Sequence, residues 1–114
     1  MQDVNAKFED LFGTGVEPSR FFCPGRVNII GEHIDYLGGL VMPAAISLGI
    51  TGIVRFSETQ NIRLTSTSFN GFSEFDLENL PNKKQGHWTD YVLGVINSVR
   101  REGISLKGFD LLLD

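Results

Sequence analysis

Short strand-forming runs separated by glycine and proline dominate the chain between residues 20 and 56. β-branched and aromatic side chains are concentrated in these runs, as in strands of known structure. The predicted strands are residues 20–23, 27–30, 40–46 and 49–56. Pro24-Gly25 is expected to interrupt the first pair, Gly38-Gly39 to form a tight turn, and Pro43 to mark a sheet edge or an irregularity. This part of the chain should therefore fold as a meander of strands.

Two segments carry apolar residues at the spacing of an amphipathic helix. The first begins near Val4 and should stop at Gly13. The second covers residues 88–101, with Arg100 and Arg101 near its carboxyl end, where positive charge complements the helix dipole. Its apolar face comprises Trp88, Tyr91, Val92, Val95, Ile96 and Val99. We expect this face to lie against the sheet.

Two further segments alternate apolar with polar positions. Residues 61–66 and 72–77 are predicted as half-buried strands, paired antiparallel across Asn70-Gly71. Residues 80–86 are predicted as a polar loop. Runs of strands with helices added indicate a single α+β domain in which the helices pack on the sheet.

The end of the sequence is a dense apolar run. Residues 109–113 predict a buried strand, yet Asp114 follows without a turn or any further element. We therefore expect residues 1–114 to be a partial domain. Loss of a neighbour would leave this last strand as an exposed sheet edge, through which copies of the chain could associate.

Composition narrows the class of ligand. A formal net charge of -4 provides no broad basic surface, which argues against nucleic acid and anionic membranes as partners. The single cysteine, Cys23, cannot form an internal disulfide and is expected to be a small buried hydrophobe. No signal peptide and no spanning apolar run are recognisable. A cytoplasmic protein with a small, neutral ligand fits these observations.

Charged and polar side chains gather in one short segment. Arg26, Asn28, Glu32, His33 and Asp35 lie within ten residues, and glycines bracket them on both sides. Glycine permits the backbone conformations and close approaches with which a loop surrounds a small ligand. Ionised carboxylates accept strong hydrogen bonds from sugar hydroxyls, and the arginine can stabilise a phosphoryl group. This cluster predicts a sugar site.

The same segment resembles a known signature. Residues 25–36 (GRVNIIGEHIDY), followed by residues 38–44 (GGLVMPA), are similar to the first signature motif of the galactokinases. Two positions depart from the common pattern, Ile34 where Thr is usual and Leu37 where Asn is usual. The galactokinases belong to the GHMP kinases, so the resemblance implies the amino-terminal GHMP kinase domain, a ribosomal S5 domain 2-like fold with a mixed or antiparallel sheet.

The resemblance also implies an activity and residue roles. Galactokinases transfer the γ-phosphoryl group of ATP, as its Mg²⁺ complex, to the anomeric hydroxyl of α-D-galactose, giving galactose 1-phosphate. By this resemblance Glu32, His33 and Asp35 bind galactose hydroxyls, and Arg26 sits beside the anomeric oxygen. Residues 87–92 (HWTDYV), followed by Gly94-Val95, resemble the helix that galactokinases place beside the nucleotide site. By this resemblance Trp88 and Tyr91 border the adenine. The full-length enzyme would be a monomer, and no metal ligand is assigned in this chain.

Other readings remain open on the sequence alone. A galactokinase-like sensor would bind the same sugar and nucleotide but act through a protein partner, and a related kinase could act on N-acetylgalactosamine or arabinose. Trp88 and Tyr91 could belong to the core instead of a nucleotide site. Glu32, His33 and Asp35 lack the usual spacing of metal ligands. The family's phosphate loop and catalytic aspartate, which would distinguish several of these readings, are expected beyond Asp114.

The missing elements give a first prediction. Phosphoryl transfer depends on positioning and charge stabilisation around the phosphates, so the 114-residue chain alone should have no kinase activity. A coupled assay for ATP-dependent galactose phosphorylation by the purified chain checks this. Turnover that survives further purification would contradict the prediction.

Overall fold

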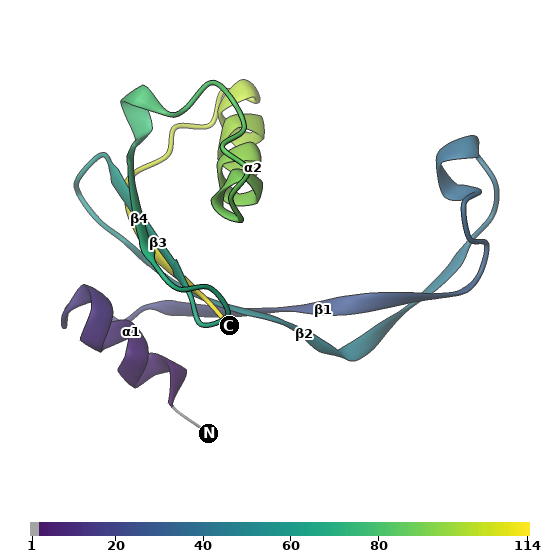
Figure 1. Ribbon diagram of the computed structural model, residues 1–114, viewed down its shortest axis with the longest axis horizontal. Coiled ribbons are helices and arrows are strands. Elements are labelled where there is room, and N and C mark those ends of the chain that lie inside the picture. The colour runs from purple at the N-terminus through teal and green to yellow at the C-terminus, as the bar shows by residue number, and fades with distance from the viewer. Residues whose placement is uncertain (1–2) are drawn as a thin grey trace.

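A five-stranded sheet organises the chain in the computed structural model, which describes residues 3–114. The strands lie in the order β1-β2-β5-β3-β4 (Figure 1). Their bounds are β1 Ser19–Ile30, β2 Met42–Phe56, β3 Asn61–Ser66, β4 Phe72–Asp76 and β5 Phe109–Leu113. Only the β3–β5 pair is parallel among these described strands, and the others are antiparallel. The predicted α+β class and mixed sheet are confirmed.

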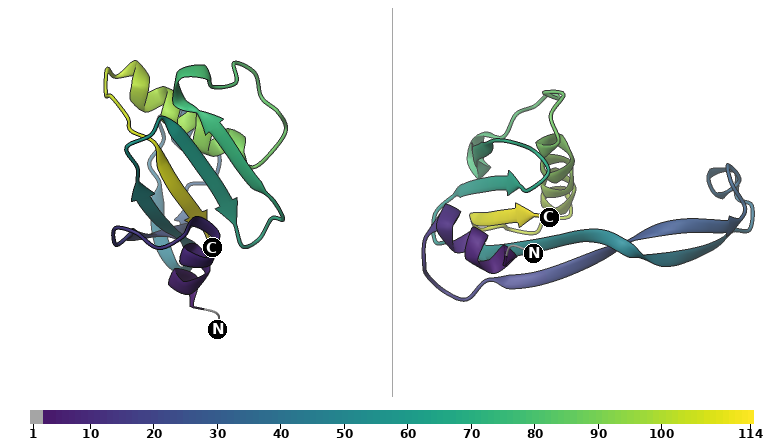
Figure 2. Two further views of the ribbon diagram at one scale, coloured as in Figure 1. Left: turned by 90° about the vertical axis from the view of Figure 1, so that its left-hand side faces the viewer. Right: turned by 60° about the horizontal axis from the view of Figure 1, so that its bottom comes forward.

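Two α-helices cover opposite faces of the sheet (Figures 1 and 2). Helix α1, Val4–Phe12, begins at Asp3, whose side chain accepts a hydrogen bond from the Asn5 amide, and ends at Gly13 as predicted. Helix α2, Thr89–Arg101, follows the polar loop. Two short 3-10 helices, η1 Asp35–Leu37 and η2 Leu77–Asn79, complete the elements. Neither α-helix of the described chain has the length and apolarity to cross a membrane.

The core is divided between the two faces. The buried cluster between α2 and the sheet comprises Ile62, Leu64, Leu77, Leu93, Ile96 and Phe109. The buried cluster between α1 and the sheet comprises Phe8, Phe12, Ile53 and Leu112. Strand β5 contributes to both clusters because successive side chains of a strand point to opposite faces. Each helix is therefore held by its own apolar layer on a shared sheet.

Strands β1 and β2 extend far beyond the rest of the sheet. Only Gly52–Phe56 of β2 pairs with β5, so the remainder of β2 pairs with β1 alone. The result is a two-stranded ribbon, here called the arm, that projects from the body of the molecule and carries η1 at its tip (Figures 1 and 2). Most residues of the arm are exposed. The sugar-motif residues therefore lie away from the core.

Two predicted interruptions of the arm are wrong. Strand β1 runs through Pro24-Gly25, and β2 is continuous where two strands had been predicted. The pairing absorbs the irregular residues through register shifts, between Pro24 and Arg26 and between Asn28 and Ile30. At the first shift the strands approach so closely that a Cβ on Gly49 would collide with the Cys23 carbonyl and the Phe22 ring. The second shift lies beside Pro43, which pairs with Asn28.

Three further expectations are corrected by the packing. Strand β5 is not an edge: it lies between β2 and β3, so the proposed route to self-association loses its basis. Cys23 is exposed because it lies on the arm, away from both apolar clusters. The predicted face of α2 is correct only in part: Ile96 is buried and Trp88 and Val92 pack on the core, but Tyr91 and Val95 are exposed. Thr89 and Leu93 complete the buried face instead.

A partly buried ion-pair network joins three strands to α1. Asp110 of β5 is the register partner of both Arg55 of β2 and Arg63 of β3. Its carboxylate accepts two hydrogen bonds from Arg63, at 2.6 and 2.7 Å, and one from Arg55 at 3.4 Å. Arg55 also donates to the carbonyls of Phe12 and Gly13, each at 2.9 Å. The hydrogen bond to Asp110 raises the pKa of Arg63 above its ordinary value.

This network predicts a large effect of removing its single carboxylate. Asp110→Asn should lower the free energy of unfolding by about 3 kcal/mol, because two arginines lose the only anion that they share. Urea denaturation measures the change. Glu58→Gln is the control, since the Lys107–Glu58 pair is exposed and should contribute little. Similar midpoints for the two variants would contradict this role for Asp110.

Candidate functional site

The tip of the arm is a tightly folded loop. Backbone hydrogen bonds from Leu37 and Gly39 to the Ile34 carbonyl, at 3.1 and 2.8 Å, close the turn around η1. Gly31 has a φ of 99°, and a Cβ there would lie 2.8 Å from a Val41 side-chain carbon. His33 also has a positive φ, 61°, which is uncommon for a residue with a side chain. The loop is therefore held in one unusual backbone conformation.

This conformation brings the predicted sugar-binding residues together at the tip. Glu32, His33 and Asp35 are all exposed there, within four consecutive positions. The Tyr36 hydroxyl lies 3.2 Å from Nδ1 of His33, and the two rings meet edge to face. The sequence analysis assigned no role to Tyr36. Its position three residues after His33 in the motif was the signal that could have indicated this contact. The contact fixes the orientation of the histidine ring.

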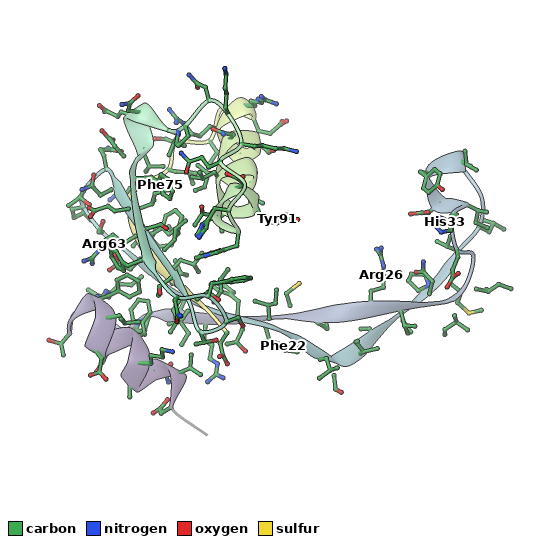
Figure 3. All side chains as sticks on the ribbon, in the orientation of Figure 1. Phe22, Arg26, His33, Arg63, Phe75 and Tyr91 are labelled. Atoms are coloured by element: carbon green, nitrogen blue, oxygen red, sulfur yellow. The ribbon has the colours of Figure 1, made fainter. Side chains whose placement is uncertain are left out.

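Arg26 lies further back along the arm, on β1 opposite Ala45. Its side chain points into the open side of the molecule between the arm and α2, and Tyr91 points into the same region from α2 (Figure 3). Among residues 3–114, Arg26, Glu32 and Asp35 form no ion pair. Their charges are therefore available to a ligand.

A separate hollow of about 890 Å³ lies along the exposed side of α2. Trp88 stacks on Phe69 at 6.1 Å between ring centroids with only 12° between the planes. Gly94 leaves the middle of the helix without a side chain, and nothing lies within 4 Å of its missing Cβ. The lining residues are Phe69, Lys84, Gly86, His87, Trp88, Asp90, Tyr91, Gly94, Val95, Ser98 and Val99. Aromatic and aliphatic walls of this kind suit a flat, largely apolar ligand group.

The hollow explains why part of the apolar face of α2 was wrongly predicted to lie against the sheet. Tyr91 and Val95 are 83% and 64% exposed because they line the hollow instead of the core. Trp88 lines the hollow and also packs on the buried cluster. Phe69 was missed because it lies in the turn between β3 and β4, distant in sequence. The structure thus brings Trp88 and Tyr91 together, but it does not bring them into contact with the residues of the arm.

The described residues show no metal centre. No group of three or more His, Cys, Asp or Glu side chains in this part of the chain is arranged to hold an ion. Glu32, His33 and Asp35 are close in sequence, but they offer hydrogen-bonding groups and not a ligand set.

The chain is similar in sequence to known galactokinases. The galactokinase galactose-binding signature matches residues 6–56. The galactokinase of Lactococcus lactis subsp. cremoris is 44% identical over 113 residues, covering 96% of this chain and 28% of the relative. The galactokinase of Clostridium beijerinckii is 42% identical over 118 residues, covering 98% of this chain and 30% of the relative.

Solved structures give the same result. The Lactococcus lactis galactokinase complexed with galactose superimposes with a TM-score of 0.90 at 42% identity, covering 96% of this chain and 29% of that one. The Methanococcus jannaschii mevalonate kinase gives a TM-score of 0.65 at 19% identity, covering 87% and 32%, which shows a shared fold alone.

The sheet, its two helices and its long arm are thus the fold that the GHMP kinases share. Within that class, the signature at the tip of the arm and the identity along almost the whole sequence decide the family. The chain belongs to the galactokinase family. It spans about 28% of the length of the first of these curated relatives.

Substitution of two glycines at the tip tests whether close packing at Gly31 determines the conformation of the loop. Gly31→Ala should displace the loop, because the new Cβ meets Val41 and the Leu40 carbonyl in addition to the strained φ. Gly38→Ala should be milder, costing about 1 kcal/mol from the positive φ alone, since its Cβ meets nothing within 4 Å. Amide chemical shifts of residues 31–41 compare the two variants. Equal perturbation would contradict the steric role of Gly31.

Proposed function

We propose that this chain carries the sugar-recognition and adenine-recognition elements of an ATP-dependent kinase that phosphorylates the anomeric hydroxyl of galactose. The observation that carries the proposal is the shared orientation of two sites. The arm presents Arg26 toward the same open side of the molecule as Tyr91 of the α2 hollow (Figure 3). A sugar at the tip and a nucleotide on α2 would thus approach each other from opposite sides of this region.

Sugar recognition is assigned to the tip of the arm. Glu32 and Asp35 provide exposed carboxylates that accept hydrogen bonds from hydroxyl groups. If the Tyr36 hydroxyl donates to Nδ1 of His33, Nε2 of the ring carries the proton and donates to a sugar oxygen. An epimer that moves one hydroxyl leaves one of these groups unpaired, at a cost of about 1–3 kcal/mol. The tip therefore has the chemistry to select galactose among related sugars.

Arg26 is assigned to the phosphoryl group in transfer. Its guanidinium makes no ion pair in the described structure. It lies on the arm between the tip and the body, on the side that α2 faces (Figure 3). From there it would stabilise negative charge on the phosphoryl oxygens as these pass from nucleotide to sugar.

The α2 hollow is assigned to adenine. Stacked Trp88 and Phe69, with Tyr91 and Val95, form walls that fit an aromatic base, and Gly94 leaves space for it. ATP would supply the phosphoryl group. The family's phosphate loop and catalytic aspartate are proposed to lie outside these 114 residues. Among residues 3–114, no group of three or more His, Cys, Asp or Glu side chains is arranged to hold a metal ion. Residues 1–114 are thus proposed as part of a sugar-binding domain in a cytoplasmic enzyme.

A chimaeric enzyme tests this function. This chain would replace the matched region of the Lactococcus lactis galactokinase, to which it is 44% identical. The chimaera should phosphorylate galactose, with N-acetylgalactosamine and arabinose assayed in parallel. Asp35→Ala should lower kcat/KM for the sugar about tenfold to a hundredfold, because a charged hydrogen-bond acceptor is removed.

Asp10→Ala is the control, since Asp10 is an exposed residue of α1, on the body of the molecule. A chimaera that unfolds cooperatively like its parent but phosphorylates none of these sugars would overturn the proposed function. An unchanged kcat/KM for Asp35→Ala would overturn the role of that residue.

A further inference from the structure

We propose that Asp90 is the positioning residue of the adenine pocket: its carboxylate holds the loop before α2 as a fixed wall against which the base binds. This inference rests on the proposed function, because it assigns the α2 hollow to a nucleoside. It adds a residue that acts through the loop and makes no contact with the phosphates.

The hydrogen bonds of Asp90 define the role. Its Oδ2 accepts from the backbone amides of Gln85 and Gly86 at 3.0 and 2.9 Å, and its Oδ1 lies 3.1 Å from the Gln85 amide. The Asp90 amide in turn donates to the His87 carbonyl at 3.0 Å. The loop is therefore tied to the first turn of α2 from both directions. These backbone hydrogen bonds, that from Gln85 above all, hold the pKa of Asp90 below its ordinary value of 3.8.

The tied loop forms one side of the hollow. Lys84, Gly86 and His87 line it directly. Gly86 takes a φ of 75°, which turns the backbone toward Asp90. His87 is itself fixed, since its Nδ1 lies 3.0 Å from the Thr89 hydroxyl. A wall held by this many contacts requires little ordering when a ligand binds, which favours affinity.

The loop also determines where Trp88 lies. Trp88 directly follows the tied residues. Its indole stacks on Phe69 and lies beside the His87 ring, with ring centroids at 6.1 and 5.7 Å. The amides of Gln85 and Gly86 are already bonded to Asp90, so they are not free to bind phosphate. The ligand group assigned to this wall is the flat base of a nucleoside, because the stacked rings of Trp88 and Phe69 provide an aromatic surface beside it. Adenosine and ATP should depend on Asp90 to the same degree.

Trp88 makes a direct experiment possible, because it is the only tryptophan of the 114-residue chain and lines the hollow. Its fluorescence would be titrated with adenosine and with ATP in the unmodified chain and in Asp90→Asn. The variant keeps the size of the side chain but loses one acceptor. We expect it to weaken both ligands by about fivefold, the order of effect expected for the loss of one hydrogen bond. Amide exchange at Gln85 and Gly86 should become faster in the variant.

Asp76→Asn is the matched control. Asp76 likewise accepts a backbone hydrogen bond, from the Glu78 amide at 2.9 Å, but it caps η2 and does not line the hollow. It should leave both affinities unchanged. Asp90→Glu, which retains the charge and both acceptor oxygens, should recover part of the lost affinity. Thermal unfolding of all variants shows whether any loss comes from the fold as a whole.

The outcomes separate the inference from the function on which it rests. If the unmodified chain binds neither adenosine nor ATP, the assignment of the hollow to adenine fails, and the inference fails with it. If the unmodified chain binds both and Asp90→Asn binds them equally well, only the inference is overturned. A loss for ATP but not for adenosine would show that Asp90 acts on the phosphates, which also overturns it.

Discussion

The pairing of β5 with both β2 and β3 is the constraint on which the other features depend. It places Asp110 between Arg55 and Arg63, and this row of charges reaches the carbonyl groups at the end of α1. It also lets one strand contribute to the apolar layers under both helices. Since β5 bonds only five residues of β2, the same pairing determines where the body ends and the arm begins.

In the proposed function, the arm and α2 divide ligand recognition between them. The arm has no apolar layer beneath it, so its shape depends on strand pairing, on register shifts and on glycines at close approaches. Its tip can therefore expose carboxylates and a histidine that a core would exclude. Helix α2 is anchored by Leu93 and Ile96 and presents its other side as an aromatic hollow. A rigid helix suits a pocket for a flat base, whereas an exposed loop suits a ligand rich in hydroxyl groups.

Much of the fold could be predicted because local patterns were strong. Helix α1, the hairpin of β3 and β4, and the β5 strand agree with the periodicities and turn residues. The errors concern long-range pairing: β1 and β2 run through residues that would end a short strand, and β5 is central. The face of α2 was misread because its apolar residues serve two purposes. A helical pattern cannot separate a residue that contacts the core from one that lines a pocket.

The sequence by itself determined the chemistry of the sugar motif and the types of the elements, because these depend on residues close together along the chain. Only the tertiary structure decided that the motif lies on a projecting arm, that Phe69 joins Trp88 in a hollow, and that Asp90 ties the loop beside it. Those features arise from strand register and helix packing, in which residues far apart in the chain meet. Local sequence preferences determine the secondary structure of each segment. The burial of shared apolar surface and the pairing of charges then determine how the segments pack together.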